Sequence, residues 1–372
     1  MYPGYENINL TEYDTLFGYY TLGFIQQHRP DLFIIDIRLK NRSWDCSHDL
    51  ANYDWLEPEI QQGLSQGRSV VIIPEDEHVA FVVNTQLTKI LNNYVDSPVY
   101  WITMLDHVAQ EAYRKLHRFR IKMLELPWLL LNECLTYYRV ANTAADFATN
   151  NHDYNFFCLI GNTVSVHKTD LARELHKKQL SGYGLITVNK NWSFPEDLLE
   201  FCQVNEENIY RSADPTYPII ARQTNINGVW VSKNVENYLL IDQKYHDIPL
   251  AVNPETTTIH FKSTEKSIWP VLLGKLFLIY GRPGSMAWIQ RFYDVDITAF
   301  ADITYDAADE TTPGNGEDYD KRRLRKMIDD NQDLIKNAKD IHQQLQPVLE
   351  SARWTLGKNL YNFFVAQLES IP

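Results

Sequence analysis

Apolar runs that end in polar residues recur along the first part of the chain. The segments "DLFIIDIRLK" (31–40), "RSVVIIPEDEH" (68–78) and "SPVYWITML" (97–105) place β-branched and aromatic residues before charged or polar ones. This pattern is typical of buried parallel strands that reach their carboxyl ends. Helical patterns follow at "TQLTKILNNYV" (85–95) and "HVAQEAYRKLHRFRIKML" (107–124). The alternation of strands and helices predicts an α/β fold with a parallel sheet.

The second part of the chain repeats this alternation. Helical spacing of apolar residues in "KTDLARELHKKQL" (168–180) predicts an amphipathic helix whose Leu171 and Leu175 face inward. The predicted strands of this part are "YNFFCLIGN" (154–162), "LITVN" (185–189), "YPIIARQ" (217–223), "DIPLAVNPETT" (247–257) and "KLFLIYG" (275–281). A second Rossmann-like unit is therefore expected.

The polar segment between these two parts has no strong period and predicts a linker. "YYRVANTAADFATNNHDYN" (137–155) is this segment. We therefore predict an amino-terminal domain over 1–145 and a second domain over 146–320. The remainder, 321–372, is nearly all helical in pattern, with apolar positions on one side. We expect it to pack back across both domains.

Composition narrows the classes of protein that fit. A hydrophobic fraction of 44% is enough to fill two cores, so a disordered chain is excluded. No apolar run is long enough to span a membrane, and the start lacks the plan of a secretory signal, so we expect a cytoplasmic protein. The net charge of −13 favours small or neutral partners over general nucleic-acid coating. The four cysteines have no spacing typical of a zinc site or a disulfide framework.

The stretch "STEKSIWPVLLGKLFLIYGRPGS" (263–285) carries a candidate ligand site. Thr264 is suited to cap a helix, which would put Glu265 and Lys266 in the first turn, where unpaired N–H groups attract an anion. Lys266 could neutralise a phosphate, and Glu265 could accept hydrogen bonds from a ribose diol. Gly281 and Gly284, in the loop after the strand, would let the backbone approach a ligand closely. The alternative is a capped helix with a solvated Lys–Glu pair, followed by a tight turn.

This stretch resembles a signature of phage and giant-virus glycosyltransferases related to fucosyltransferase-like GT-B enzymes. The shared pattern is Thr-Glu-Lys, a proline, a buried strand and a Gly-x-Pro-Gly loop. "NFFCLIGNTVSVHKTDLARELHKKQLSGYGLITVN" (155–189) is similar to a second block of that family, with His167 and Lys168 where His-Arg is usual. "LAVNPETT" (250–257) resembles a third block and places an acid at Glu255. The resemblance covers roughly residues 150–370.

The resemblance implies a metal-independent glycosyltransferase with a GT-B-like fold. Two Rossmann-like domains would face across a cleft, the second would bind a nucleotide-diphosphate sugar, and the last helices would cross back. No cofactor or metal is implied, because helix dipoles and basic side chains would neutralise the leaving diphosphate. The implied donor-binding residues are Thr264, Glu265, Lys266, Glu255, Lys168, His167, Gly281, Arg282 and Gly284.

A transferase that inverts the sugar needs a general base near the acceptor hydroxyl. Glu77 lies in the segment 68–78, just past the carboxyl end of its predicted strand, and Asp36 ends the neighbouring one. We predict Glu77 as the base and Asp36 as the second choice. The alternative is that these acids only end strands and cap the helices that follow.

A basic segment carries the candidate acceptor-binding residues. "EAYRKLHRFRIK" (111–122) interleaves aromatic and basic residues, so Arg114, Arg118 and Arg120 could grip a nucleic-acid backbone. The alternative is an amphipathic helix with a solvated basic face. The acceptor is then either a hydroxymethylated base in phage DNA or a viral glycan.

A second class of function remains open from the sequence. The chain could keep the GT-B shell as a catalytically inactive nucleotide-binding or assembly protein, because the Asn-Arg-Arg run of the family's second block is absent. A dinucleotide oxidoreductase is disfavoured, since no G-x-G-x-x-G follows a predicted strand.

Overall fold

A computed structural model divides the chain into two compact units. Unit 1 contains the described residues 134–205 and 248–359, and unit 2 contains the described residues 19–127, 223–232 and 360–372. The predicted boundary at residue 145 lies outside the described residues. The structure describes residues 19–37, 52–73, 85–103, 110–111, 114–115, 118–127, 134, 154–161, 166–189, 195–205, 223–226, 229–232, 248–255, 265–307 and 317–372.

Unit 2 is built on a four-stranded sheet in the order β1-β2-β3-β4, in which every neighbouring pair is parallel. The first three strands confirm the strands predicted within 31–40, 68–78 and 97–105. The inner strand β2 is buried at all four positions, as expected where a parallel sheet is covered on both faces. The four strands are β1 (Phe33–Asp36), β2 (Val70–Ile73), β3 (Val99–Thr103) and β4 (Lys122–Glu125).

The fourth strand corrects the helix predicted over 107–124. Residues 118–121 are not helical, and β4 begins at Lys122. The sequence here alternates charged and apolar residues, and the apolar Phe119 and Ile121 are buried. This period of two is the pattern of a strand, and it outweighed the helical spacing of the residues before it. Phe119 packs edge-on against Trp101 in the core, so it offers no exposed ring for stacking.

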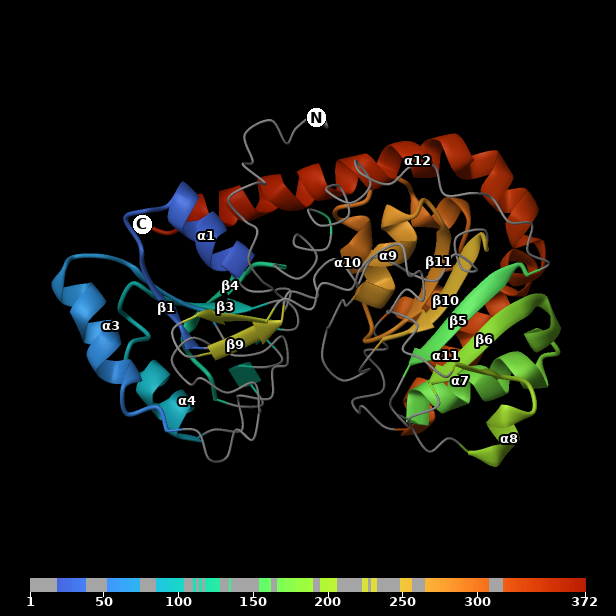
Figure 1. Cartoon of the computed structure of the whole chain (residues 1–372), viewed down its shortest axis with the longest axis horizontal. Coiled ribbons are helices and arrows are strands. Elements are labelled where there is room, and N and C mark those ends of the chain that lie inside the picture. The colour runs from blue at the N-terminus through green and yellow to red at the C-terminus, as the bar shows by residue number, and fades with distance from the viewer. Residues whose placement is uncertain are drawn as a thin grey trace. The chain divides into compact units, whose positions relative to one another are not determined.

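The strand order of unit 2 leaves one face of its sheet in need of a cover. Right-handed crossovers between strands that follow one another across a sheet place all their helices on the same face. Figure 1 shows α3 and α4 on one side of this sheet, and α1 with the last turns of α12 on the other. Ring contacts of Phe24 with Tyr361 and Phe364 join these two helices. The helices are α1 (Tyr19–His28), α3 (Leu56–Ser65), α4 (Thr85–Asn92) and α12 (Gln332–Glu369).

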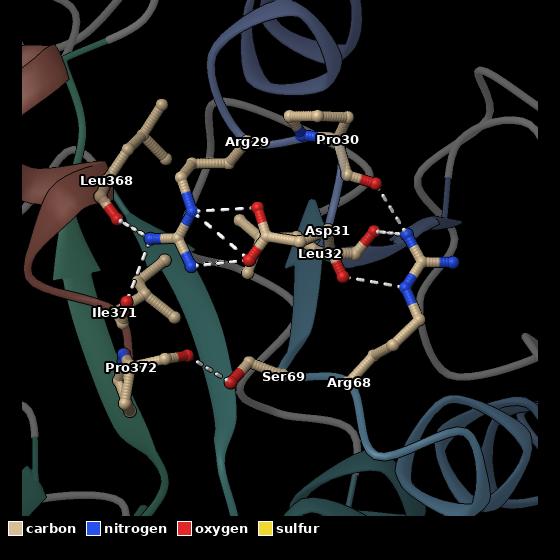
Figure 2. A network of polar contacts seen from close by, with 9 residues as sticks. All are labelled: Arg29, Pro30, Asp31, Leu32, Arg68, Ser69, Leu368, Ile371 and Pro372. Atoms are coloured by element: carbon tan, nitrogen blue, oxygen red, sulfur yellow. Dashed lines mark hydrogen bonds and ion pairs between the residues drawn. The ribbon is translucent and has the colours of Figure 1, made fainter.

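Arg29 holds the end of α12 against unit 2 (Figure 2). Its Nη1 donates to the carbonyl oxygens of Leu368, at 2.6 Å, and Ile371, at 2.8 Å. The last carbonyls of a helix lack intrahelical partners. The Leu368 carbonyl accepts a backbone bond from Ile371 N at 3.2 Å, and the guanidinium adds a charged donor to it. Asp31 accepts hydrogen bonds from Arg29 Nε and Nη2, and this holds the pKa of the Asp31 carboxyl below its usual value. Ser69 Oγ donates to the Pro372 carbonyl at 2.8 Å.

Unit 1 is built on a five-stranded sheet, again parallel throughout, in the order β11-β10-β5-β6-β7. Numbered by their order in the chain, these strands run 5-4-1-2-3 across the sheet, which is the doubly wound Rossmann order. The predicted α/β class with two parallel sheets is therefore confirmed. The strands are β5 (Phe156–Gly161), β6 (Gly184–Asn189), β7 (Gln203–Asn205), β10 (Leu250–Pro254) and β11 (Leu276–Tyr280).

Helices cover both faces of the unit 1 sheet. Figure 1 shows α7 and α11 on one face and α9 and α10 on the other. Leu171 and Leu175 of α7 are buried, as its amphipathic pattern predicts. The helices are α7 (Val166–Lys177), α8 (Glu196–Leu199), α9 (Glu265–Leu272), α10 (Ser285–Gln290) and α11 (Glu317–Asp330), with short 3₁₀ turns η3 (Ser181–Tyr183), η6 (Ile297–Ala299) and η7 (Thr304–Asp306).

The remaining elements complete the two units. Helix α12 has non-helical dihedrals at Asn337, and its residues divide between unit 1, up to Asn359, and unit 2, from Leu360. A separate antiparallel hairpin pairs β8 (Gln223–Ile226) with β9 (Val229–Ser232). Of the strand predicted over 217–223, all but Gln223 lies outside the described residues. In the part of the chain that is described, no helix has the length and apolar character to cross a bilayer.

Replacing Arg29 by alanine should destabilise unit 2 by about 1–3 kcal/mol, because the carbonyls at the end of α12 would lose a charged donor. The measurement is the free energy of unfolding by chemical denaturation. Arg173→Ala is the matched control: its pair with Asp197 is largely exposed, so its loss should cost less than about 1 kcal/mol. Equal losses in the two variants would show that Arg29 does not anchor the helix end.

Candidate functional site

The order of strands in unit 1 creates a switch point between β5 and β10. These strands are neighbours, but the chain leaves β5 toward β6 on one side and leaves β10 toward β11 on the other. In open α/β sheets such a reversal opens a crevice at the carboxyl ends of the two strands, where ligands bind. The residues just beyond β5 and β10, and the first turns of α7 and α9, therefore form the candidate site.

Glu255 joins four segments at this edge. It follows β10 directly and is 0% exposed. Its backbone N–H donates to the Tyr280 carbonyl at 2.9 Å, and its own carbonyl accepts from His167 Nε2 at 2.8 Å. Its carboxylate accepts a hydrogen bond from Ser267 Oγ in the first turn of α9. Glu255 thus links the ends of β10 and β11 to the amino-terminal turns of α7 and α9.

His167 is the half-buried member of this cluster. Burial lowers its pKa below the ordinary value, and the positive charge of Lys168 acts in the same direction. The hydrogen bond to the Glu255 carbonyl and the carboxylates of Asp320 and Asp170 oppose the shift without cancelling it. His167 is therefore neutral at physiological pH. Lys168, the next residue of α7, is 2% exposed.

The loop after β11 packs closely on Glu255. A Cβ atom at Gly281 would lie 2.9 Å from Ser285 Oγ and 3.2 Å from Glu255 Cγ, so a larger residue does not fit. The close approach that the sequence predicted at Gly281 is thus an approach to protein atoms. Gly284 has φ of 88°, a left-handed conformation that favours glycine, and its Cβ position faces open space. Arg282 is half-buried between them.

Asp306 and Arg323 fix the shape of this loop. Asp306 Oδ2 accepts from the backbone N–H groups of Met286, at 2.8 Å, and Ala287, at 3.2 Å, so the amino end of α10 is occupied by a protein carboxylate. Arg323 Nη1 and Nη2 donate to the Gly281 carbonyl at 3.2 and 3.1 Å. Both side chains are buried. The loop is therefore held rigid beside the switch point.

Burial raises the pKa of Asp306 to about 7. The backbone N–H groups of Ala287, Met286 and Gly284 and the guanidinium of Arg323 favour the ionised form, but desolvation outweighs them. Asp306 Oδ1 has no hydrogen-bond partner among the described residues and lies 3.8 Å from Arg323 Nη2. This carboxyl group therefore changes charge near neutral pH.

Unit 2 also carries polar side chains at the carboxyl edge of its sheet. Asp36, Thr103 and Glu125 end β1, β3 and β4, and all three are buried. In the register of the sheet, Asp36 lies level with Ile73. Thr103 lies level with Glu125, one residue closer to the carboxyl ends of the strands than the Asp36–Ile73 pair. Because side chains alternate between faces, Asp36 projects to one face and the Thr103–Glu125 pair to the other. Thr103 and Glu125 were not predicted, and the part of the predicted helix from residue 118 onward, which was wrong, concealed Glu125.

Two of the three proposed acceptor-binding arginines, Arg118 and Arg120, do not lie at this edge. Arg118 and Arg120 are exposed and precede β4, so they stand at its amino end, opposite to Glu125. Asn92 fixes their turn: its Nδ2 donates to the Arg118 carbonyl at 2.9 Å, and its Oδ1 accepts from Arg120 N at 2.8 Å. Arg114 forms an ion pair with Glu111 at 2.6 Å. The structure thus separates Arg118 and Arg120 from Asp36.

The donor-site residues predicted from sequence fall into three groups. His167, Glu255 and Gly281 come together at the switch point, with Lys168 next to His167 on α7 and with Arg282 and Gly284 in the loop that follows β11. Glu265 and Lys266 form the first turn of α9, as predicted. Thr264 and the proposed base Glu77 lie outside the described residues. Ser267 was missed, although a polar residue at the start of an otherwise apolar helix was a signal that could have found it.

Comparison with known proteins gives no match. Neither a protein-family model, nor a curated protein, nor a solved structure matches this chain. Within the described residues, no group of three or more His, Cys, Asp or Glu side chains is placed to hold a metal ion. The case for a function therefore depends on the geometry of the site and on the sequence resemblance.

The raised pKa of Asp306 predicts a stability that depends on pH. The folded protein keeps a proton that the unfolded chain releases near pH 3.8, so the free energy of unfolding should fall as pH rises from about 4 to about 7 and then level off. Asp306→Asn should remove this component, which is on the order of a few kcal/mol. Thermal unfolding of both proteins between pH 5 and pH 8 measures it.

Asp302→Asn serves as the control for Asp306→Asn. Hydrogen bonds from Thr304 lower the pKa of Asp302, so this group stays ionised across the same range. The control should follow the pH dependence of the unmodified protein. Parallel curves for Asp306→Asn and the unmodified protein would contradict the assignment.

Proposed function

We propose that unit 1 binds a nucleotide-diphosphate sugar and that the protein is a glycosyltransferase of GT-B type. The observation that carries the proposal is the polar cluster of His167, Glu255 and Ser267 at the switch point of a doubly wound sheet. Sheets of this order bind nucleotides at that position. The sequence resemblance to viral glycosyltransferases supplies the reaction class.

The diphosphate is proposed to bind at the first turn of α9. This helix begins at Glu265, and its Ser267 donates to Glu255 at the end of β10, so the N–H groups of its first turn lie near the switch point. Lys266 would neutralise the phosphates and Glu265 would hold the ribose hydroxyls. Negative charge that develops on the leaving diphosphate would be stabilised by the same N–H groups and by Lys266.

Glu255 is proposed to position the site and not to contact the sugar. Its side chain is buried and already accepts a hydrogen bond from Ser267. Its backbone also holds His167 and the end of β11. Glu255 thus fixes the first turns of α7 and α9 relative to each other, which pre-organises the site for the diphosphate.

Unit 2 is proposed to bind the acceptor and to supply the general base. Asp36 ends β1 at the carboxyl edge, and Glu77 comes after the end of β2 in the chain, outside the described residues. The acceptor is proposed to be a hydroxymethylated base in phage DNA or a viral glycan. The exposed Arg118 and Arg120 stand at the opposite edge of the unit 2 sheet, so they would contact only an acceptor long enough to reach both edges.

The second candidate function is a nucleotide-binding protein without transfer activity. Between β5 and α7 the sequence has Asn162, Thr163 and Val164, and the Asn-Arg-Arg run of the enzymes that it resembles is absent. Many sugar transferases slowly release free sugar and nucleoside diphosphate without acceptor. Hydrolysis of the bound donor would support the transferase, and stable binding without hydrolysis would support the alternative.

The unmodified protein should be stabilised by one class among UDP-, GDP-, dTDP- and CDP-linked sugars, since a ligand that binds only the folded state raises the melting temperature. Lys266→Ala should then weaken that donor by roughly 1.5–3 kcal/mol, the range for a charged hydrogen bond, at nearly unchanged stability. Titration calorimetry measures the affinity. Lys326→Ala, which removes an exposed lysine of α11, is the control and should bind as the unmodified protein does. Unchanged affinity in Lys266→Ala would move the donor site elsewhere.

Glu77→Gln should lower turnover far more than donor affinity, because a general base acts on the acceptor in the transition state. Asp36→Asn is the comparison, since this buried carboxylate is the second candidate. Steady-state transfer rates and donor binding are measured for both variants. A comparable loss of turnover and of donor affinity in Glu77→Gln would assign this residue a structural role.

A further inference from the structure

The bond between His167 and Glu255 fixes which nitrogen of the imidazole carries the proton. His167 Nε2 lies 2.8 Å from the Glu255 carbonyl oxygen. A carbonyl oxygen can only accept, so Nε2 is the N–H donor. In the neutral ring the other nitrogen, Nδ1, then presents a lone pair. Within the described part of the chain, no hydrogen bond reaches Nδ1.

The surroundings keep this ring neutral. Three charged groups influence its charge from two helices: Lys168 and Asp170 lie on α7 with His167, and Asp320 lies on α11. Burial and Lys168 disfavour a second proton, and they outweigh the two carboxylates. Tyr280 lies beside the ring, with centroids 6.4 Å apart, and donates its hydroxyl hydrogen to the Asp320 carbonyl instead of to His167.

We propose that His167 Nδ1 accepts a hydrogen bond from a hydroxyl group of the bound nucleotide sugar. The inference rests on the proposed function and adds the recognition chemistry beside the first turn of α7. A hydroxyl group can donate to the lone pair of Nδ1, whereas the oxygens of a diphosphate diester have only lone pairs and would be repelled. His167 therefore selects a neutral hydroxyl, and the diphosphate is left to the first turn of α9.

Two substitutions separate the two nitrogens of this ring. His167→Gln places an amide N–H close to the position of Nε2, so it can keep the bond to the Glu255 carbonyl while it loses the Nδ1 acceptor. His167→Asn places an amide oxygen close to Nδ1, so it keeps the acceptor and loses the bond to Glu255. The two variants have the same chemistry and differ in which end of the imidazole they replace.

The experiment measures the affinity for the nucleotide sugar that most stabilises the unmodified protein, by titration calorimetry at pH 8. His167→Gln should keep its melting temperature and bind about tenfold more weakly, the effect of one lost hydrogen bond. His167→Asn should bind more tightly than His167→Gln, because the acceptor remains although the bond to Glu255 is lost. Equal affinity of His167→Gln and the unmodified protein would overturn the inference.

The pH dependence of binding by the unmodified protein tests the same point. Protonated Nδ1 cannot accept a hydrogen bond, so affinity should be constant above the ordinary imidazole pKa of about 6.5 and fall as pH drops below the lowered pKa of His167. The diphosphate diester does not titrate in this range. His167→Asn should show no such fall. An affinity that rises as pH drops would mean that a charged His167 binds phosphate, and would refute the proposal.

The proposed function and the role of His167 would fail in different ways. If no nucleotide sugar stabilises the unmodified protein, the proposed function fails and this inference fails with it. If a nucleotide sugar binds, but its affinity is unchanged in His167→Gln and does not fall at low pH, only the role of His167 is wrong.

Discussion

The right-handedness of crossover connections shapes both units of this protein. A helix that joins two parallel strands packs back on the sheet in one hand only, so the order of strands decides which face each helix covers. In unit 1 the order reverses between β5 and β10, which distributes helices over both faces and opens a switch point. In unit 2 the order does not reverse, so one face must be covered by other segments of the chain. Helix α1 and the end of α12 supply that cover.

The same constraint explains why polar side chains gather at the carboxyl edge of unit 1. The strands end together there, and each leaves backbone groups that need partners. The Glu255 backbone donates to the Tyr280 carbonyl and accepts from His167 Nε2, and its carboxylate accepts from Ser267. Arg323 donates to the carbonyl of Gly281. These bonds hold the first turns of α7 and α9 in fixed positions. A site held in this way does not have to order itself when a ligand binds, which lowers the cost of binding.

Buried ionisable groups at this edge keep charges that differ from those they would have in water. His167 stays neutral because it is buried beside Lys168, and Asp306 takes up a proton near neutral pH because desolvation outweighs its donors. Asp306 holds the amino end of α10, so it shapes the loop, while His167 lies where a ligand would bind. One group therefore contributes to stability and the other is proposed to act in recognition, although burial shifts the pKa of both.

The sequence by itself determined the elements that are buried on both faces. The runs at 68–78, 97–105 and 275–281 became strands, and α9 begins at Glu265 as the Thr-Glu-Lys pattern predicts, because local periodicity and capping depend on neighbouring residues alone. The prediction from sequence failed at 118–125, where a helical pattern gives way within a few positions to an alternation of charged and apolar residues. The strand order, the Ser267–Glu255 bond and the tautomer of His167 were decided only by the tertiary structure. Each depends on residues that are distant in the chain. The periodicity of a segment indicates that it is buried, but it does not identify the residues that pack against it.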